Sequence, residues 1–299
     1  MKILRTPDER FKNLPDFPYH PNYLNEIGGY NALRMHYIDE GPKDAKYTFL
    51  CLHGQPTWCY LYRKMIPIFI KAKHRVVAPD FIGFGRSDKP VEDNVYSFYF
   101  HRDTLINFIK RLDLNYIILV CQDWGGILGL TLPMDMPDRF SKLIIMNTIL
   151  GTGDFQLSEG FIAWREWSNK NPDMAIGRLM KRSCPHLTNE EDDAYNAPFP
   201  DISYKAGVRR FPNLVPDHPE ALGAEISQKA RDWFREKWSG DVFMAVGKND
   251  PVLGLPMMMI LKNTIKNSPE PYIINKAGHF VQEWGVDVAK KALKSFNLE

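Results

Sequence analysis

Short uninterrupted runs of Ile, Leu and Val are the feature that most constrains the fold of this chain. Two of them, TFLCLHG and RVVAPDF, lie between residues 47 and 81, and the segment between them has apolar residues at helical spacing. The pattern repeats with a helix expected over 101–112, the run YIILVCQD, a helix expected from Trp124, and the run KLIIMN. Strands that are apolar along their whole length are covered on both faces, which is typical of parallel sheets. The sequence therefore predicts an α/β protein with a mostly parallel, doubly wound sheet.

The sequence changes character twice along its length. Within residues 30–40, the run ALRMHYIDE alternates apolar and polar residues, which is typical of an antiparallel strand at the edge of a sheet. After Gly151 there is no strand-like run, only helical patches broken by Pro, Asn and acidic clusters such as NEEDDAYNAPFP. Strand signals return in DVFMAVG and PYIINKAGH, before a helix expected over 281–296.

These changes predict one interrupted core. We expect residues 1–150 and 218–299 to form the two parts of the core, and residues 151–217 to form a helical cap inserted between them.

The charge balance excludes several classes of partner. There are 38 basic and 36 acidic side chains, and no run of Lys or Arg follows a phosphate backbone, so we expect no nucleic-acid partner. No apolar stretch approaches the roughly 18 residues that a membrane span requires, so we expect no membrane partner. The first residues, MKILRTPDERFKNL, lack the apolar stretch of a signal peptide.

The cysteines point to a reducing compartment. No C-x-x-C pair or metal-ligand spacing links the four, which are Cys51, Cys59, Cys121 and Cys184. We expect reduced thiols in the core and a cytoplasmic protein.

The most informative segment is CQDWGGI, residues 121–127, which directly follows an Ile/Leu/Val strand and opens a helix. This is the setting of the nucleophile elbow, in which small residues flank a strained turn that presents one side chain. Here that side chain is the carboxylate of Asp123. The alternative for Asp123 is an ordinary cap of the following helix.

Two further polar residues follow strands. Asp250 lies in GKND after DVFMAVG, and His279 follows PYIINKAG, so both lie beyond the carboxyl ends of strands, where open parallel sheets place their sites. The order of nucleophile, acid and histidine is that of the α/β-hydrolase fold. We expect Asp123, Asp250 and His279 to form a catalytic triad.

A fourth element is the loop HGQPT, residues 53–57, after the strand TFLCL. In this fold that loop supplies one backbone N–H of the oxyanion hole, and the residue after the nucleophile supplies the other. Gln55 and Trp124 are the candidates. His53 has no second ligand at a suitable spacing, so we expect no metal.

An aspartate at the elbow restricts the reaction. A serine that attacked an sp3 carbon would form an ether, whereas a carboxylate forms an ester that water can cleave. We expect an alkyl-aspartate intermediate on Asp123, hydrolysed by water that His279 activates, while Asp250 holds the imidazole tautomer.

Trp124 indicates which group leaves. An indole N–H is a neutral donor on an apolar ring, suited to an anion too weakly basic to need a proton, and halide fits that description. With HGQPTW, CQDWGGILGL, GKNDPVLG, AGHFVQEWG and, in the cap, GFIAW, the chain resembles the haloalkane dehalogenases over nearly its whole length.

The resemblance implies one branch of that family, in which two tryptophans hold the halide. Here these are Trp124 and Trp164 of GFIAW, while Asp250 is the acid. Other branches have Asn where this chain has Gln55, and place the acid near residues 147–154.

Two smaller points follow from the same sequence. The resemblance implies a cis peptide between Gln55 and Pro56. The alternative for Trp164 is a core aromatic on an amphipathic helix that it shares with Trp167.

Three rival functions use a similar fold. An epoxide hydrolase has the same triad and two cap tyrosines as proton donors, for which Tyr195 and Tyr204 are available. A fluoroacetate dehalogenase would have Arg in place of Trp124, and a receptor without turnover would tolerate a broken triad, whereas this one is intact. We therefore expect a haloalkane as substrate, a halide ion as product, no cofactor, and a monomer.

Overall fold

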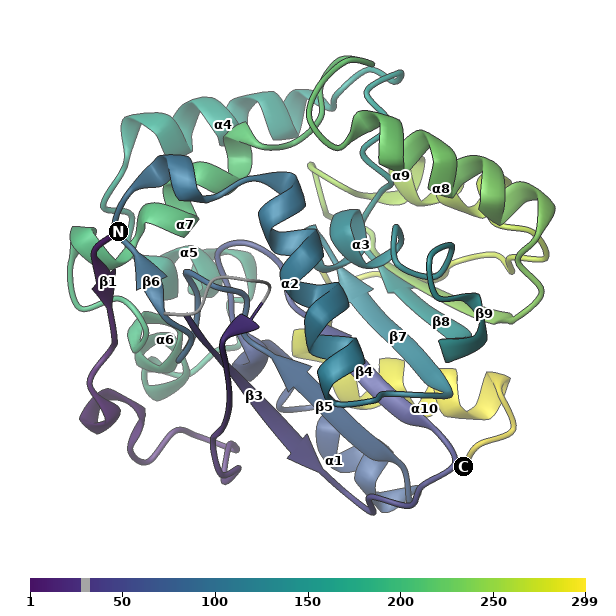
Figure 1. Ribbon diagram of the computed structural model, residues 1–299, viewed down its shortest axis with the longest axis horizontal. Coiled ribbons are helices and arrows are strands. Elements are labelled where there is room, and N and C mark those ends of the chain that lie inside the picture. Colours follow the sequence, from purple (N-terminus) through teal and green to yellow (C-terminus); the bar gives the residue numbers. More distant parts are fainter. Residues whose placement is uncertain (28–32) are drawn as a thin grey trace.

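An eight-stranded sheet runs through the protein, in the order β10-β9-β8-β7-β4-β5-β3-β2 (Figure 1). The computed structural model describes residues 1–27 and 33–299. Strands β10 through β5 in this order are parallel, and β3 and β2 are antiparallel to their neighbours. The strands of the sheet are β2 (Asn22–Asn25), β3 (Arg34–Glu40), β4 (Thr48–Leu52), β5 (Arg75–Pro79), β7 (Ile117–Gln122), β8 (Phe140–Met146), β9 (Asp241–Gly247) and β10 (Tyr272–Ile274). This confirms the predicted α/β class with a mostly parallel sheet.

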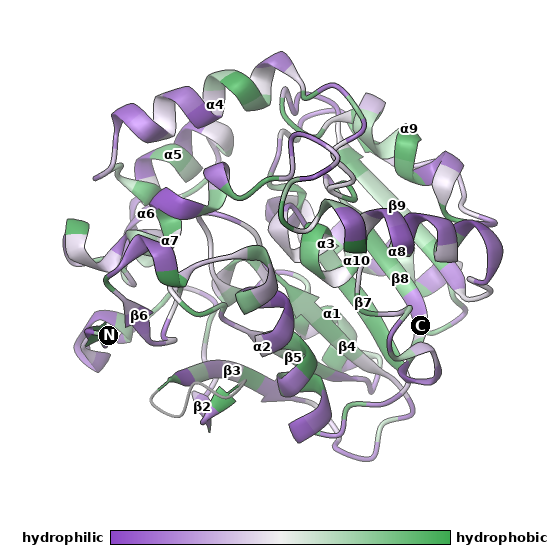
Figure 2. Cartoon of the chain, turned by 45° about the horizontal axis from the view of Figure 1, so that its top comes forward, coloured by the Kyte–Doolittle hydropathy of each residue, from purple (hydrophilic) through white to green (hydrophobic). Residues whose placement is uncertain are grey.

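Helices cover both faces of the sheet. In Figure 1, α1 and α10 lie behind it, and α2, α3 and α8 lie in front. The helices of the core are α1 (Ile66–Lys71), α2 (Phe98–Arg111), α3 (Trp124–Gly129), α8 (Ala224–Glu236), α9 (Leu255–Thr264) and α10 (Gly285–Ser295). Every residue of β4 and β7 is buried, as the continuous apolar runs predicted, and Figure 2 shows the central strands in green.

The edge of the sheet differs from the prediction. β3 is antiparallel, as expected, but it is not an edge strand, because β2 pairs along its outer side. The short run Asn22–Asn25 begins and ends with Asn and carries no apolar alternation, so no sequence pattern predicted this strand. Residues 30–32 of the predicted strand lie outside the described residues. A separate pair of two-residue strands, β1 (Ile3–Leu4) and β6 (Lys89–Pro90), was also too short to predict.

Two predicted helices are shorter than their apolar patterns. Between β4 and β5 a 3-10 turn, Cys59–Tyr62, precedes α1. Helix α1 begins only at Ile66, because Pro67 has no N–H and favours the first turn of a helix. The last helix is likewise divided into a 3-10 turn, η8 (Val281–Trp284), and α10.

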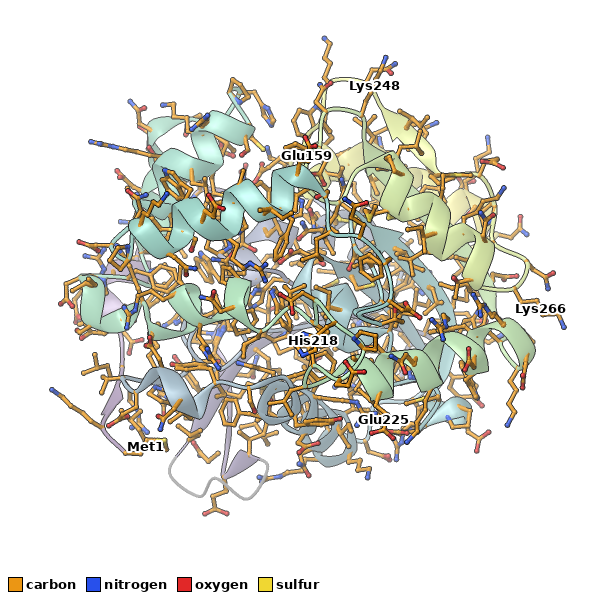
Figure 3. The ribbon with its side chains drawn as sticks, turned by 90° about the horizontal axis from the view of Figure 1, so that it is seen from above. Met1, Glu159, His218, Glu225, Lys248 and Lys266 are labelled. Atoms are coloured by element: carbon orange, nitrogen blue, oxygen red, sulfur yellow. The ribbon has the colours of Figure 1, made fainter. Side chains whose placement is uncertain are left out.

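Between β8 and β9 the chain forms only helices. In residues 147–240, all of which are described, no strand occurs. The helices of the inserted segment are α4 (Glu159–Lys170), α5 (Ile176–Ser183), α6 (Asn189–Asn196) and α7 (Ala206–Arg210). Seen from above in Figure 3, α4 begins at Glu159 and crosses the molecule on the same face as His218. The side chain of Ser158, which caps α4, donates to the carbonyl of Val252 after β9. The inserted helices therefore adjoin the carboxyl end of the sheet.

A buried ionic cluster joins this segment to the core. Arg63, which is 1% exposed, donates to both carboxylate oxygens of Glu283 at 2.7 and 2.8 Å and to Glu191 of α6 at 2.5 Å. Tyr195 of α6 donates to Glu283 as well. A buried guanidinium must keep its carboxylate partners, so this cluster ties α6 to the core.

Two further findings bear on the sequence-based expectations. All four cysteines are buried and free. No helix in the described part of the chain has both the length and the hydrophobicity that crossing a membrane requires.

Candidate active site

The turn between β7 and α3 presents the carboxylate of Asp123. Its φ of +51° is rare for a residue with a side chain, and such strain is concentrated at functional sites. The glycines that follow are needed because a Cβ at Gly125 would lie 2.0 Å from the carbonyl oxygen of Leu52, and one at Gly126 would lie 2.2 Å from Oγ1 of Thr148. The CQDWGG pattern therefore forms the predicted elbow.

His279 and Asp250 lie beside the elbow. Nε2 of His279 is 3.6 Å from Oδ2 of Asp123, and its Nδ1 is 2.8 Å from Oδ2 of Asp250. Asp250 is 8% exposed, so a carboxylate is buried directly behind the imidazole. The three residues that the sequence named are therefore brought together, in the order carboxylate, imidazole, carboxylate.

Asn147, at the end of β8, is part of the same network. Its side-chain amide donates to Oδ2 of Asp250 at 2.6 Å, and its side-chain oxygen accepts from the N–H of Gly247 at 3.0 Å. It is the first residue of the stretch 147–154, in which other branches place their acid. Sequence reasoning did not assign it a function, although its place after a parallel strand is a usable signal.

Charge interactions within the triad shift the pKa values of both partners. Burial favours the neutral form of Asp250, but the charge and hydrogen bond of His279, the amide of Asn147 and the N–H of Val252 outweigh it and lower the pKa. Burial likewise lowers the pKa of His279, yet Asp250 and Asp123 outweigh it and raise the pKa to about 10. Two carboxylates thus stabilise an imidazolium between them.

The loop after β4 reaches the elbow through its backbone. The N–H of Gln55 donates to Oδ1 of Asp123 at 2.7 Å, and the peptide between Gln55 and Pro56 is cis, as expected. The Gln55 side chain instead donates to the carbonyl of Val208 in α7. Trp124 is the first residue of α3, so its N–H has no acceptor within the helix.

The base of this loop is fixed by hydrogen bonds. Both ring nitrogens of His53 are used, Nδ1 with the carbonyl of Gly54 at 2.8 Å and Nε2 with the N–H of Phe81 at 3.0 Å. Neither is therefore free to bind a metal.

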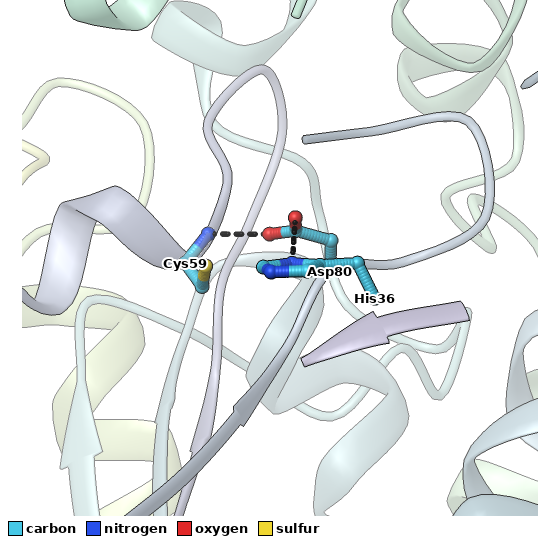
Figure 4. Close-up of side chains that lie close together, drawn as sticks. All are labelled: His36, Cys59 and Asp80. Atoms are coloured by element: carbon cyan, nitrogen blue, oxygen red, sulfur yellow. Dashed lines mark hydrogen bonds and ion pairs between the residues drawn. The ribbon is translucent and has the colours of Figure 1, made fainter. Parts of the chain in front are cut away.

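A second cluster, formed by His36, Cys59 and Asp80, has metal-ligand residue types close together (Figure 4). Oδ1 of Asp80 accepts from the N–H of Cys59 at 2.8 Å, and Oδ2 accepts from His36 at 2.7 Å and from the N–H of Arg86 at 2.8 Å. Burial opposes ionisation of Asp80, but His36 and these hydrogen bonds hold its pKa below the usual range. Both carboxylate oxygens of Asp80 therefore already accept hydrogen bonds. The cluster holds the backbone at Cys59, just after the loop 53–57, in place.

A small cavity of about 30 Å³ lies against Asp123. Among the described residues that line it, Asp123 is the only charged one and Ser158 the only other polar one, with a hydroxyl already bonded to the carbonyl of Val252. The remaining lining residues are Ile127, Ile149, Phe155, Leu157, Phe161, Val215, Val252, Leu253 and Met257. They come from both the core and the inserted segment. The cavity therefore suits the alkyl part of a small molecule.

The two predicted halide ligands have different surroundings. Trp124 is 2% exposed and packs edge-on against Phe211 at 4.7 Å, whereas Trp164 is half-buried and stacks on Trp167 at 5.5 Å. Neither Trp124 nor Trp164 is among the described residues that line the cavity beside Asp123. Within residues 1–27 and 33–299, neither indole N–H meets an acceptor. Both donors are available to a ligand, and the pairing of Trp164 with Trp124 stays a prediction.

The two tyrosines considered as the proton donors of an epoxide hydrolase lie away from the cavity beside Asp123. The hydroxyl of Tyr195 is buried, donates to Glu283 and accepts from Arg63 at 3.2 Å. Neither Tyr195 nor Tyr204 lines the cavity. Among the described residues that line the cavity there is therefore no tyrosine to protonate an opening epoxide ring.

Comparison with known proteins agrees with this geometry. A model of the alpha/beta hydrolase fold matches residues 47–286. A haloalkane dehalogenase from Psychrobacter cryohalolentis is 46% identical over 296 residues, which cover 97% of this chain and 96% of that one. The chain belongs to the haloalkane dehalogenase family.

Further members are similar over the whole length. The dehalogenase from Mycolicibacterium paratuberculosis is 38% identical, with 98% of each chain covered. The tetrameric structure of a haloalkane dehalogenase from Paraglaciecola agarilytica superposes with a TM-score of 0.97 at 54% identity, with 100% of both chains covered. The protein is therefore a hydrolase that acts on carbon–halide bonds, as the resemblance implied.

The contact between Gly54 and Asp123 leads to a first prediction. A Cβ at Gly54 would lie 2.3 Å from Oδ1 of Asp123 and displace the carboxylate from the Gln55 N–H. We expect Gly54→Ala to lower the rate of halide release about 100-fold, by analogy with the loss of an oxyanion donor. The control is Gly278→Ala, next to His279, where the nearest atom would be 3.8 Å away. Similar rates for the two variants, with unchanged melting temperatures, would contradict the assigned contact.

Proposed function

We propose that Asp123 is the nucleophile that hydrolyses haloalkanes. One carboxylate oxygen attacks the carbon that bears the halogen, the carbon–halogen bond breaks with its electron pair on halide, and an alkyl ester remains on Asp123. The observation that carries this proposal is that Asp123 is the single charged group among the described residues of an apolar cavity and lies 3.6 Å from His279. An anion that faces an apolar cavity is poorly solvated on that side, which favours its attack on carbon.

His279 then acts as the base for the second step. Its Nε2 takes a proton from a water molecule, whose oxygen attacks the carbonyl carbon of the ester and releases the alcohol. Asp250, 2.8 Å from Nδ1, stabilises the imidazolium that forms. The N–H groups of Gln55 and Trp124 stabilise the negative charge on the carbonyl oxygen, and the 2.7 Å contact of Gln55 with Asp123 supports this assignment.

Trp124 and Trp164 hold the departing halide. The support is their unpaired indole N–H groups and, for Trp124, its position next to the nucleophile. We further propose that residues 151–217 act as a cap that closes the cavity, since Phe155, Leu157 and Phe161 of this segment line it.

A variant without the imidazole separates the two steps. Displacement of halide needs only an ionised Asp123, whereas ester hydrolysis needs His279. We expect His279→Phe, mixed with excess 1,2-dibromoethane, to release about one bromide per site and then stop. Mass spectrometry will show one bromoethyl group on the peptide that carries Asp123. Continued steady release, or an adduct on another residue, would show that these roles are wrong.

The halide ligands are tested by removing one donor at a time. Trp124→Phe and Trp164→Phe keep most of the packing, and each should lower the rate about 10²- to 10³-fold, as the loss of a charge-stabilising donor does. Bound bromide should quench tryptophan fluorescence less in these variants. Trp167→Phe is the matched control on the same helix, 40% exposed and stacked on Trp164. If Trp164→Phe keeps the wild-type rate and Trp167→Phe lowers it, the halide donor of the cap is Trp167 and not Trp164.

Assembly and location are the remaining parts of the proposal. The relative from Paraglaciecola agarilytica is tetrameric at 54% identity, so we propose a tetramer for this chain in place of the monomer expected from the sequence. We also propose the cytoplasm as its location, which four free buried cysteines support. Sedimentation of the purified protein should give the mass of four chains. A single-chain mass at micromolar concentration would restore the sequence-based expectation.

A further inference from the structure

Gln122, the last residue of β7, contacts the nitrogen of His279 that must accept a proton from water. Its amide nitrogen lies 2.8 Å from Nε2 of His279 and 3.2 Å from the backbone carbonyl oxygen of the same residue. The side chain is fully buried, and its own oxygen has no hydrogen-bond partner. Sequence reasoning treated Gln122 only as a flank of the elbow.

The carbonyl of His279 fixes the orientation of this amide. A carbonyl oxygen can only accept a hydrogen bond, so the group that faces it must be the NH2 of Gln122. The same NH2 faces Nε2, so this contact is a hydrogen bond only when Nε2 is unprotonated and presents its lone pair. The orphan oxygen of Gln122 is consistent with this orientation, because turning the amide would place two carbonyl oxygens against each other.

The opposite side of the ring completes the arrangement. Nδ1 of His279 donates to Asp250, and the ring edge contacts Phe280 at 4.9 Å. The charged groups that face the ring are Asp250, after β9, and Asp123, before α3, and both favour a protonated ring. Gln122 is the contact that favours the neutral ring, with its proton on Nδ1.

We propose that Gln122 is a positioning residue, which favours the neutral tautomer of His279 against the two carboxylates and is displaced from Nε2 by the hydrolytic water. This inference rests on the proposed function, since it assigns Gln122 to the second step of that mechanism. Nε2 has one lone pair in the ring plane, so the Gln122 N–H and a water molecule cannot both use it. Once the ester forms, Asp123 carries no charge, and proton transfer from water to the freed Nε2 proceeds.

The test is the pH dependence of ester hydrolysis in Gln122→Met, which keeps an unbranched side chain but has no donor. Removing a donor from the unprotonated Nε2 favours the protonated ring, so the pKa of His279 rises. We expect the acidic limb of the hydrolysis rate to move up by about one pH unit, a tenfold change in proton affinity. Above this limb the variant should hydrolyse the ester at least as fast as the wild type, because Nε2 is no longer shared. The halide burst of the first step should be unchanged.

The control is Gln282→Met, which changes another fully buried glutamine close to His279 in the chain. It should leave the midpoint of the limb unmoved. A uniform slowing of Gln122→Met at every pH, with an unmoved midpoint, would overturn the proposal and leave Gln122 with a packing role.

Two further measurements separate the possible failures. If neither the wild type nor any variant gives a halide burst or an Asp123 ester, the proposed function itself is wrong, and so is the role of Gln122 that rests on it. If Gln122→Met does not fold, the wild-type protein still decides: with ¹⁵N-labelled glutamine, the Gln122 side-chain amide signals should shift with the titration midpoint of His279. Amide signals that do not follow that titration would contradict the contact on which the proposal depends.

Discussion

The strained turn at Asp123 is the constraint on which the rest of the site depends. A residue with a side chain adopts φ +51° there only because the chain on either side is fixed, by the buried strand β7 before it and by helix α3 after it. The turn brings α3 so close to β4 that Gly125 cannot carry a Cβ. The same closeness brings the N–H of Gln55 to 2.7 Å from the carboxylate. Replacing Gly125 would therefore disturb the nucleophile and its hydrogen bond together.

The parallel register assembles the site from distant parts of the chain. β4, β7, β8 and β9 are neighbours in the sheet, and all point their carboxyl ends the same way. The loop after β4, the end of β8 and the loop after β9 therefore meet around the elbow, and His279 joins them from the segment after β10. The residues brought together in this way are Gln55, Gln122, Asp123, Asn147, Asp250 and His279.

Sequence reasoning succeeded where a feature is local and failed where partners are decided by three-dimensional packing. The elbow could be predicted because strand, small residues and helix adjoin Asp123 directly, and Asp250 and His279 because each follows a recognisable strand. β2 was missed because its short polar run has no pattern, and the edge was placed at β3. Whether Tyr195 could serve as a proton donor could not be decided from the sequence, since only the fold shows that its hydroxyl donates to Glu283. The contact of Gln122 with His279 spans 157 residues, and no spacing encodes it.

The arrangement of polar groups separates the two chemical steps in space. One side of Asp123 faces an apolar cavity, where a poorly hydrated carboxylate is a stronger nucleophile. The other side faces His279, which Asp250 favours as an imidazolium and Gln122 favours as a neutral ring. While Asp123 is an anion, it too favours the imidazolium, which cannot act as a base. Forming the ester removes that charge, so the first step itself lowers the pKa of His279 and prepares the base for the second.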